Sequence, residues 1–455
     1  MSVLLFILLI LAEAGFIVSE SVRKDNKKEW TLRRAIANAA EIAVFLIMIL
    51  LPGIDLSFRF RALAVLLIVR LAVSLIIFLI YRKNEKVKKQ AGKVFSGLLS
   101  LILILTSLVP AFVFRDYNGR PLTGKYEVLQ DDVILIDRSR TENFESDGSF
   151  REVPMHLYYP AGYETMEPKS LPLVIFSHGA FGYYKSNFST YAELVSHGYV
   201  VASLDHPYHA FFTKDSSGKT VTVDPKFIST AMDVGGRDVS ESEIFPITSE
   251  WMKLREDDMN FVVDCFIKAG KEGALDDAWF FPDKAGNPAA GIVASINTDK
   301  IGLMGHSLGG ATAVSVGRRD DISAVIDLDG TMLGEEVSVT DEGILKVNEE
   351  PYGNPLLSID NDEHHRQRLE STKKGGIYPN NVIIDNASQG FETYFKGSGH
   401  MNFTDLPLFA PSLAKMLGTG GIDPAACIDQ VNALVLDFFN CYLKGEGTFD
   451  VKECY

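Results

Sequence analysis

A serine stands between two glycines in the run GHSLGG that begins at Gly305. Glycine at the second position before and after a serine is typical of a nucleophile elbow, a strained turn that joins a strand to a helix. Residues 300–304 are predicted to form a buried strand, and residues 311–316 a helix of small side chains. The pattern predicts Ser307 as a nucleophile, with glycine required at Gly305 and Gly309 because larger residues would collide with the neighbouring chain.

From residue 125 onward, short β-rich runs alternate with amphipathic stretches, as in a mostly parallel sheet covered by helices. A leading hairpin is predicted, followed by further strands, in the order 127–137, 153–159, 171–176, 199–204, 300–304, 323–328, 355–359 and 392–395. Helices are predicted at 191–195, 251–266 and 427–443. Together with the elbow, this order predicts an α/β-hydrolase fold over residues 125–446, followed by a tail at 447–455.

A nucleophilic serine needs a base to take its proton and an acid to orient that base, and in elbow-containing folds both follow the serine. His400 lies in a glycine-rich loop after the last predicted strand, where the base belongs. The histidines at 364–365 lie in a polar run, which we interpret as a solvated helix start. The acid is open: Asp329 follows one predicted strand, whereas Asp360 and Asp362 follow the next, which is the more usual place.

Acyl transfer also needs hydrogen-bond donors for the oxyanion that develops on the substrate. One predicted donor is the backbone N–H of Leu308, directly after the serine. The second is expected from the loop after the strand at 171–176, which begins with His178 and Gly179. Long insertions near 210–250 and 270–298 contain apolar residues that either cap the acyl pocket or pack as a small satellite core.

The first 115 residues are predicted to form an all-α membrane domain, joined to the rest by a linker at 116–124. Four apolar segments, each near the length that crosses a bilayer as a helix, lie at 3–18, 35–51, 62–81 and 94–114. A cleaved signal peptide is the alternative for the first, but its start lacks a positive charge. The loops before the second and fourth segments are rich in Lys and Arg, which predicts that everything after residue 114 is extracytoplasmic.

Charge divides the chain in the same way. Residues 1–124 carry 17 Lys and Arg against 8 Asp and Glu, whereas the remainder carries 27 against 51. The acidic part has no basic stripe for phosphates, so nucleic-acid binding is not expected. Arg70 lies within an apolar segment, where it is predicted either to pair with Glu13 or Glu41 or to snorkel or sit in a water-filled crevice. The four cysteines have no zinc-like spacing, and an extracytoplasmic domain permits a disulfide between Cys441 and Cys454.

Four stretches together resemble the platelet-activating-factor acetylhydrolases of the plasma, or isoform II, type. They are SHG at 177–179, GHSLGGAT at 305–312, IDLD at 326–329 and GSGHMNFTD at 397–405. The resemblance covers about residues 125–445 and omits the membrane segments. It implies Asp329 as the triad acid and the amide of Ala180 as the second oxyanion donor, while the insertions depart from the family.

The sequence thus predicts a multi-pass cell-membrane protein with an extracytoplasmic serine esterase domain of phospholipase A2-like acetylhydrolase type. Its substrate is a small-molecule or lipid ester, and its triad needs no metal or organic cofactor. An acyltransferase or peptidase with the same triad is one alternative. The other is a non-catalytic membrane receptor whose hydrolase-like domain binds a ligand.

Overall fold

The computed structural model describes the chain except for residues 1, 52–53, 55, 118, 237–238 and 283–287. It separates into two compact units. The first comprises Met1–Tyr117 with Phe409–Ser412, and the second comprises Asn118–Leu408 with Leu413–Tyr455. Each unit has its own hydrophobic core.

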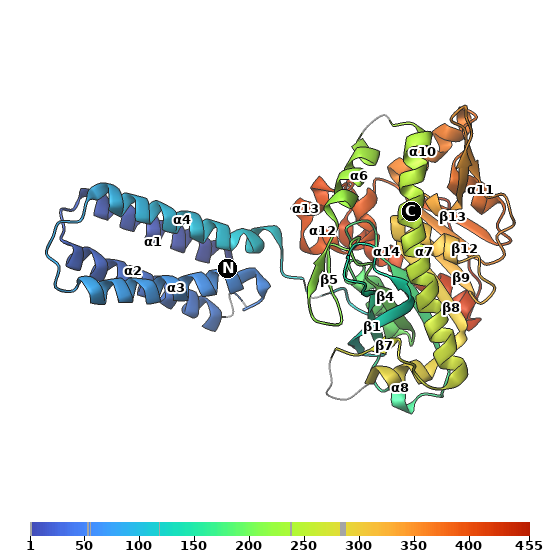
Figure 1. Cartoon of the computed structure of the whole chain (residues 1–455), viewed down its shortest axis with the longest axis horizontal. Coiled ribbons are helices and arrows are strands. Elements are labelled where there is room, and N and C mark those ends of the chain that lie inside the picture. The colour runs from blue at the N-terminus through green and yellow to red at the C-terminus, as the bar shows by residue number, and fades with distance from the viewer. Residues whose placement is uncertain (1, 52–53, 55, 118, 237–238, 283–287) are drawn as a thin grey trace. The chain divides into compact units, whose positions relative to one another are not determined.

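The N-terminal unit is a bundle of four helices, drawn in blue in Figure 1: α1 Ser2–Val22, α2 Lys27–Leu50, α3 Phe58–Tyr81 and α4 Gln90–Val113. Three stretches, Val3–Val22, Phe58–Tyr81 and Gln90–Val113, are long and apolar enough to cross a membrane. Helix α2 is not among them, because it carries Arg33, Arg34 and Glu41 along its length. The prediction of four spanning segments is therefore supported for three helices.

Buried charges of the bundle pair with one another between helices. Arg70 on α3 contacts Glu13 on α1 at 2.8 Å and Glu41 on α2 at 2.6 Å. Arg34 on α2 contacts Glu13 at 2.7 Å. The predicted pairing of Arg70 is confirmed, and it satisfies charges that would be costly alone in an apolar core.

The second unit is built on a nine-stranded sheet in the order β13-β12-β9-β8-β3-β4-β2-β1-β7. Neighbours from β13 to β4 run parallel, and β2, β1 and β7 continue antiparallel. The strands are β1 Val128–Thr141, β2 Phe150–Pro160, β3 Leu171–Ser177, β4 Val200–Leu204, β7 Trp279–Phe280, β8 Ile296–His306, β9 Ala324–Leu328, β12 Leu356–Asn361 and β13 Gly390–Phe395. The predicted α/β-hydrolase architecture is confirmed.

Helices cover both faces of this sheet (Figure 1). α7 Glu241–Glu272, α8 Pro288–Ser295 and α9 Leu308–Val316 bury apolar side chains against one face. α5 Phe188–Ser196 and α14 Pro424–Phe439 bury theirs against the other. The central strands β3, β4 and β9 and residues 301–305 of β8 are nearly continuous apolar runs, because helices cover them on both sides.

Several elements were not predicted, because they are short or polar. Small hairpins form from β5 Phe212–Lys214 with β6 Thr220–Thr222, and from β10 Glu336–Val339 with β11 Leu345–Val347. Helix α11 Pro379–Asp385 follows β12 after α10 Asp362–Lys373, whose start is the one part of this region that the polar run predicts, and α6 Pro225–Gly236 lies in the first insertion. All four cysteines carry free thiols.

Candidate active site

Ser307 occupies the turn between β8 and α9, with φ 56° and ψ −125°. This is a strained conformation for a residue with a side chain, and it lifts the hydroxyl out of the sheet. The flanking glycines are required by close backbone approaches. A Cβ atom on Gly305 would lie 2.1 Å from the carbonyl oxygen of Gly309, and one on Gly309 would lie 2.0 Å from that of Ser177.

His400 begins the 3₁₀ turn His400–Phe403 that follows β13, and it faces Asp329 at the end of β9. Its Nδ1–H donates to Asp329 Oδ2 at 2.6 Å. The backbone N–H of Asn361 donates to the other oxygen at 2.7 Å. Burial raises the pKa of Asp329, but hydrogen bonds from His364 and His400 outweigh it and hold the pKa well below its usual range. Asp329 is therefore an ionised acceptor for the imidazole.

The other two candidate acids have different partners. Asp360 pairs with Arg368, accepts from Ser358 at 3.4 Å and lies 3.5 Å from His364. Asp362 accepts from the backbone N–H of Gly397 at 2.9 Å. Each carboxylate is engaged in holding α10 or the loop that carries His400, whereas Asp329 contacts the imidazole itself.

His364 lies in the same cluster, which contradicts its interpretation as a solvated residue. Helix α10 does begin at Asp362, but the imidazole of His364 is only 7% exposed and its Nδ1–H donates to Asp329 at 3.1 Å. The expectation was wrong because the polar run faces the strand ends rather than solvent. His365 stacks on Tyr394, with ring centroids 3.9 Å apart.

Two backbone N–H groups with no hydrogen-bond partner among the described residues lie beside Ser307. One belongs to Leu308, the first residue of α9, where helical N–H groups are free. The other belongs to Ala180, in the loop after β3. A Cβ atom on Gly179 would lie 3.2 Å from the Ser307 Cβ, so this loop approaches the elbow closely. Buried His178 begins the loop, and its Nδ1–H donates to the Gly179 carbonyl.

These groups share one pocket of about 330 Å³. Ser307, His400, Asp329, Leu308 and Ala180 all line it. So do residues that the sequence analysis did not name as site residues: Trp251, Thr331, Leu333, Asn361, Glu363, His364, Gln367 and Tyr378. Most of them come from loops and helices after strand ends, where sequence pattern gives little signal.

The described residues of the first insertion lie beside the pocket rather than in its lining. Phe227 is buried in a small cluster with Met252, Leu308 and Ala311, against which Ala180 packs. Phe211 and Met232 are 60% and 70% exposed. Phe227 therefore packs as part of a small core against the elbow. The exposed side chains of Phe211 and Met232 do not cap the pocket.

Asp405, in the segment after His400, is a buried carboxyl that should make stability depend on pH. Burial raises its pKa to about 7, and Ser189 donates to it from both its backbone N–H and its hydroxyl. Because the raised pKa favours the protonated form in the folded state, the contribution of Asp405 to stability is fully present below its unfolded pKa and is lost as pH rises toward 7. We expect Asp405→Asn to gain about 2 kcal/mol relative to wild type between pH 5 and 7, measured by urea unfolding. The prediction would be contradicted if the unfolding free energies of the wild type and of Asp405→Asn changed in parallel with pH.

Comparison with known proteins identifies the family that the chain matches. Residues 150–454 match the family described as platelet-activating factor acetylhydrolase, isoform II. Platelet-activating factor acetylhydrolase from Cavia porcellus is 25% identical over 298 residues, which cover 61% of this chain and 59% of that protein. The Bos taurus protein of the same name is also 25% identical, over 297 residues with the same coverage. The match thus spans about three fifths of these relatives' length.

Among solved structures, a ferulic acid esterase from Streptomyces cinnamoneus is similar with a TM-score of 0.47 and 20% identity, over 72% of this chain and 93% of that chain. The family match covers more than half of the present chain and includes the elbow, the Asp329 strand and the His400 loop. The chain therefore belongs to the platelet-activating factor acetylhydrolase, isoform II, family.

Proposed function

We propose that this protein is a membrane-anchored serine hydrolase that cleaves carboxylic esters through Ser307, His400 and Asp329. The observation that carries the proposal is the shared pocket, in which the elbow serine, an imidazole bonded to a buried carboxylate and two free N–H groups meet. This is the set of groups that acyl transfer to serine requires.

In the proposed reaction, the Ser307 oxygen attacks the ester carbonyl while His400 takes the hydroxyl proton through Nε2. Asp329 holds Nδ1–H and stabilises the imidazolium that forms. The N–H groups of Leu308 and Ala180 bind the tetrahedral oxyanion. The C–O bond to the leaving alcohol breaks as His400 returns the proton to that oxygen. Water then attacks the acyl-serine by the same steps, which releases the acid.

Two observations, the family and the N-terminal unit, support a proposal for the substrate class. The relatives are acetylhydrolases by name, and the chain carries helices apolar enough to cross a bilayer. We infer that the enzyme acts on lipid esters of phospholipase A2-like type. The extracytoplasmic orientation of the catalytic domain is part of this proposal.

Covalent labelling tests the nucleophile directly. A fluorophosphonate probe should label the purified protein at Ser307, and peptide mass spectrometry identifies the labelled residue. Acyl esters should compete with the probe and reduce the labelling. Ser315→Ala, on the same helix, is the matched control and should label like the wild type. Loss of labelling in Ser307→Ala is expected. A label at another residue, or none in the wild type, would refute the proposal.

A further inference from the structure

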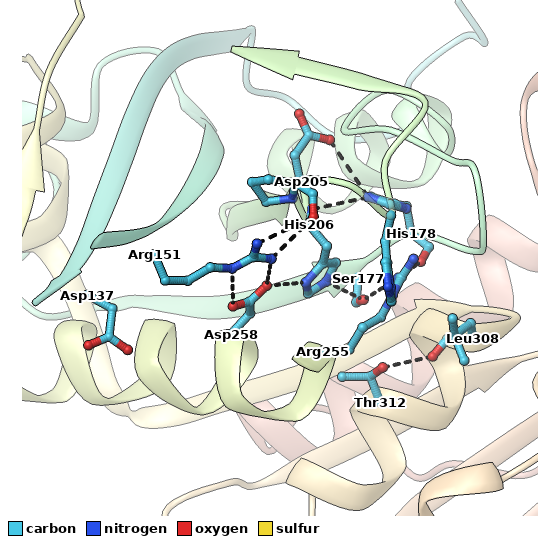
Figure 2. A network of polar contacts seen from close by, with 12 residues as sticks. Asp137, Arg151, Ser177, His178, Asp205, His206, Arg255, Asp258, Leu308 and Thr312 are labelled. Atoms are coloured by element: carbon cyan, nitrogen blue, oxygen red, sulfur yellow. Dashed lines mark hydrogen bonds and ion pairs between the residues drawn. The ribbon is translucent and has the colours of Figure 1, made fainter. Parts of the chain in front are cut away.

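A buried polar network includes His178, which begins the loop that carries Ala180 (Figure 2). It connects Arg151 of β2, Ser177 at the end of β3, His206 after β4, and Arg255 and Asp258 of α7. Asp258 accepts from Arg151 at 2.7 Å and from His206 at 3.0 Å. The network therefore joins the long helix to the strand ends on which the candidate active site is built.

Arg255 stands out in this network because its charge faces backbone rather than a carboxylate. It is completely buried, and no described carboxylate lies within 4.0 Å of it. Its guanidinium donates to the carbonyl of His178, to that of Gly179 at 3.3 Å, and to the hydroxyl of Ser177 at 3.5 Å. Its Nε donates to His209 at 3.4 Å. Burial lowers the pKa of Arg255 to about 9, which still leaves it charged at neutral pH.

The Gly179 carbonyl has a particular place in the site, because it belongs to the same peptide group as the Ala180 N–H. In a planar trans peptide, the C=O and N–H bonds point in opposite directions, so fixing one fixes the other. This oxygen accepts from Arg255 at 3.3 Å, from His178 Nδ1–H at 2.6 Å and from the Gly182 N–H at 3.0 Å. Rotating the peptide would forfeit all three bonds and turn the N–H away.

We propose that Arg255 is a positioning residue for the oxyanion site, acting through the peptide between Gly179 and Ala180. The guanidinium fixes the plane of that peptide and, by bonding its oxygen, polarises the N–H that faces the pocket. Burying a charge without a carboxylate partner is unfavourable, and orienting an oxyanion donor explains why a charge is present at this position. The inference rests on the proposed function, since it concerns how the same site stabilises an oxyanion.

The network also contains a second chain of serine, histidine and aspartate, which serves as a scaffold. Ser177 Oγ lies 2.9 Å from His206 Nε2, and His206 Nδ1 lies 3.0 Å from Asp258. All three are buried completely or nearly so, and burial together with the charge of Arg255 lowers the pKa of His206 to about 4. Without access for a substrate, this chain orients Ser177 and, through it, Arg255.

The experiment compares Arg255→Met and Arg255→Lys with Met259→Ala in the full-length protein. Met259 lies one turn along α7, is buried in the apolar core and is outside the site, so it controls for lost stability. The readouts are kcat and KM for a soluble acyl ester, and inhibition constants for two ligands. One is an alkyl boronic acid, which forms a tetrahedral serine adduct; the other is a non-reacting ether analogue of the substrate.

We expect Arg255→Met to lower kcat about 10- to 100-fold, somewhat less than loss of a direct oxyanion donor. Affinity for the boronic acid should fall by the same factor, while KM and affinity for the ether analogue stay near wild type. Arg255→Lys should lose less kcat and less affinity for the boronic acid, because the lysine ammonium keeps the positive charge although it lacks the planar guanidinium. Met259→Ala should unfold more easily and keep its kcat.

Wild-type kcat and boronic-acid affinity in Arg255→Lys and Arg255→Met would overturn the inference and leave the proposed function intact. Equal losses for the boronic acid and the ether analogue would also overturn it, since they would indicate general distortion of the pocket. If Arg255→Met does not fold, wild-type kcat and boronic-acid affinity in Arg255→Lys alone overturn the inference. A wild-type protein that neither hydrolyses esters nor labels at Ser307 would instead refute the proposed function itself.

Discussion

Asp329→Asn is expected to lower kcat about 10,000-fold while the protein stays folded. The carboxylate accepts the Nδ1–H of His400 at 2.6 Å, and this bond keeps Nε2 free to receive the serine proton. An amide at this position can instead donate to Nδ1, which places the imidazole proton on the wrong nitrogen. Steady-state hydrolysis of a soluble acyl ester measures the loss, and circular dichroism checks the fold.

Asp360→Asn is the matched control, because it changes a buried carboxylate of the neighbouring strand end. Its partners are Arg368, Ser358 and His364. We expect this variant to unfold more easily, since a buried charge loses its partner, and to keep its kcat. The opposite pattern, with Asp360→Asn inactive and Asp329→Asn active, would transfer the acid role to Asp360 and refute our assignment.

The order of elements and the elbow could be predicted because local pattern determines them. Gly305 and Gly309 flank the serine at a fixed spacing, and apolar runs of strand length recur on either side. The position of His400 follows from chain order in the fold. Asp329 and Asp360 could not be distinguished by pattern, because Asp329 directly follows β9, Asp360 lies near the end of β12, and the ends of these parallel strands share one edge of the sheet.

The long-range polar contacts of α7 and α10 could not be predicted from the sequence. Arg255 and Asp258 fall on the face of α7 that also buries Met252, Met259 and Val262. Charged residues within an apolar stripe were the available signal, yet their partners come from strands far away in the sequence. The burial of His364 is hidden for the same reason: its polar neighbours in the sequence indicate a solvated helix, whereas its contact with Asp329 is tertiary.

Gly309→Ala is expected to impair both stability and activity, because it acts where the elbow meets the oxyanion loop. The added Cβ would lie 2.0 Å from the carbonyl oxygen of Ser177 and 2.6 Å from that of His178. Backbone on both sides leaves no flexible side chain to yield, so we expect a loss of about 3 kcal/mol in unfolding free energy. Relief of the clash would separate Ser307 from the Ala180 N–H, and a displacement of about 1 Å should lower kcat about 100-fold.

Gly353→Ala provides the control for loss of glycine as such. A Cβ atom on Gly353 meets no heavy atom within 4 Å, and its φ is not in the left-handed region. This variant should keep its kcat and gain slightly in stability, because alanine restricts the unfolded chain. Urea unfolding and ester hydrolysis measured on both variants separate the two effects. If Gly309→Ala had the same unfolding free energy and the same kcat as Gly353→Ala, the active site would not depend on the close approach of the elbow to the oxyanion loop.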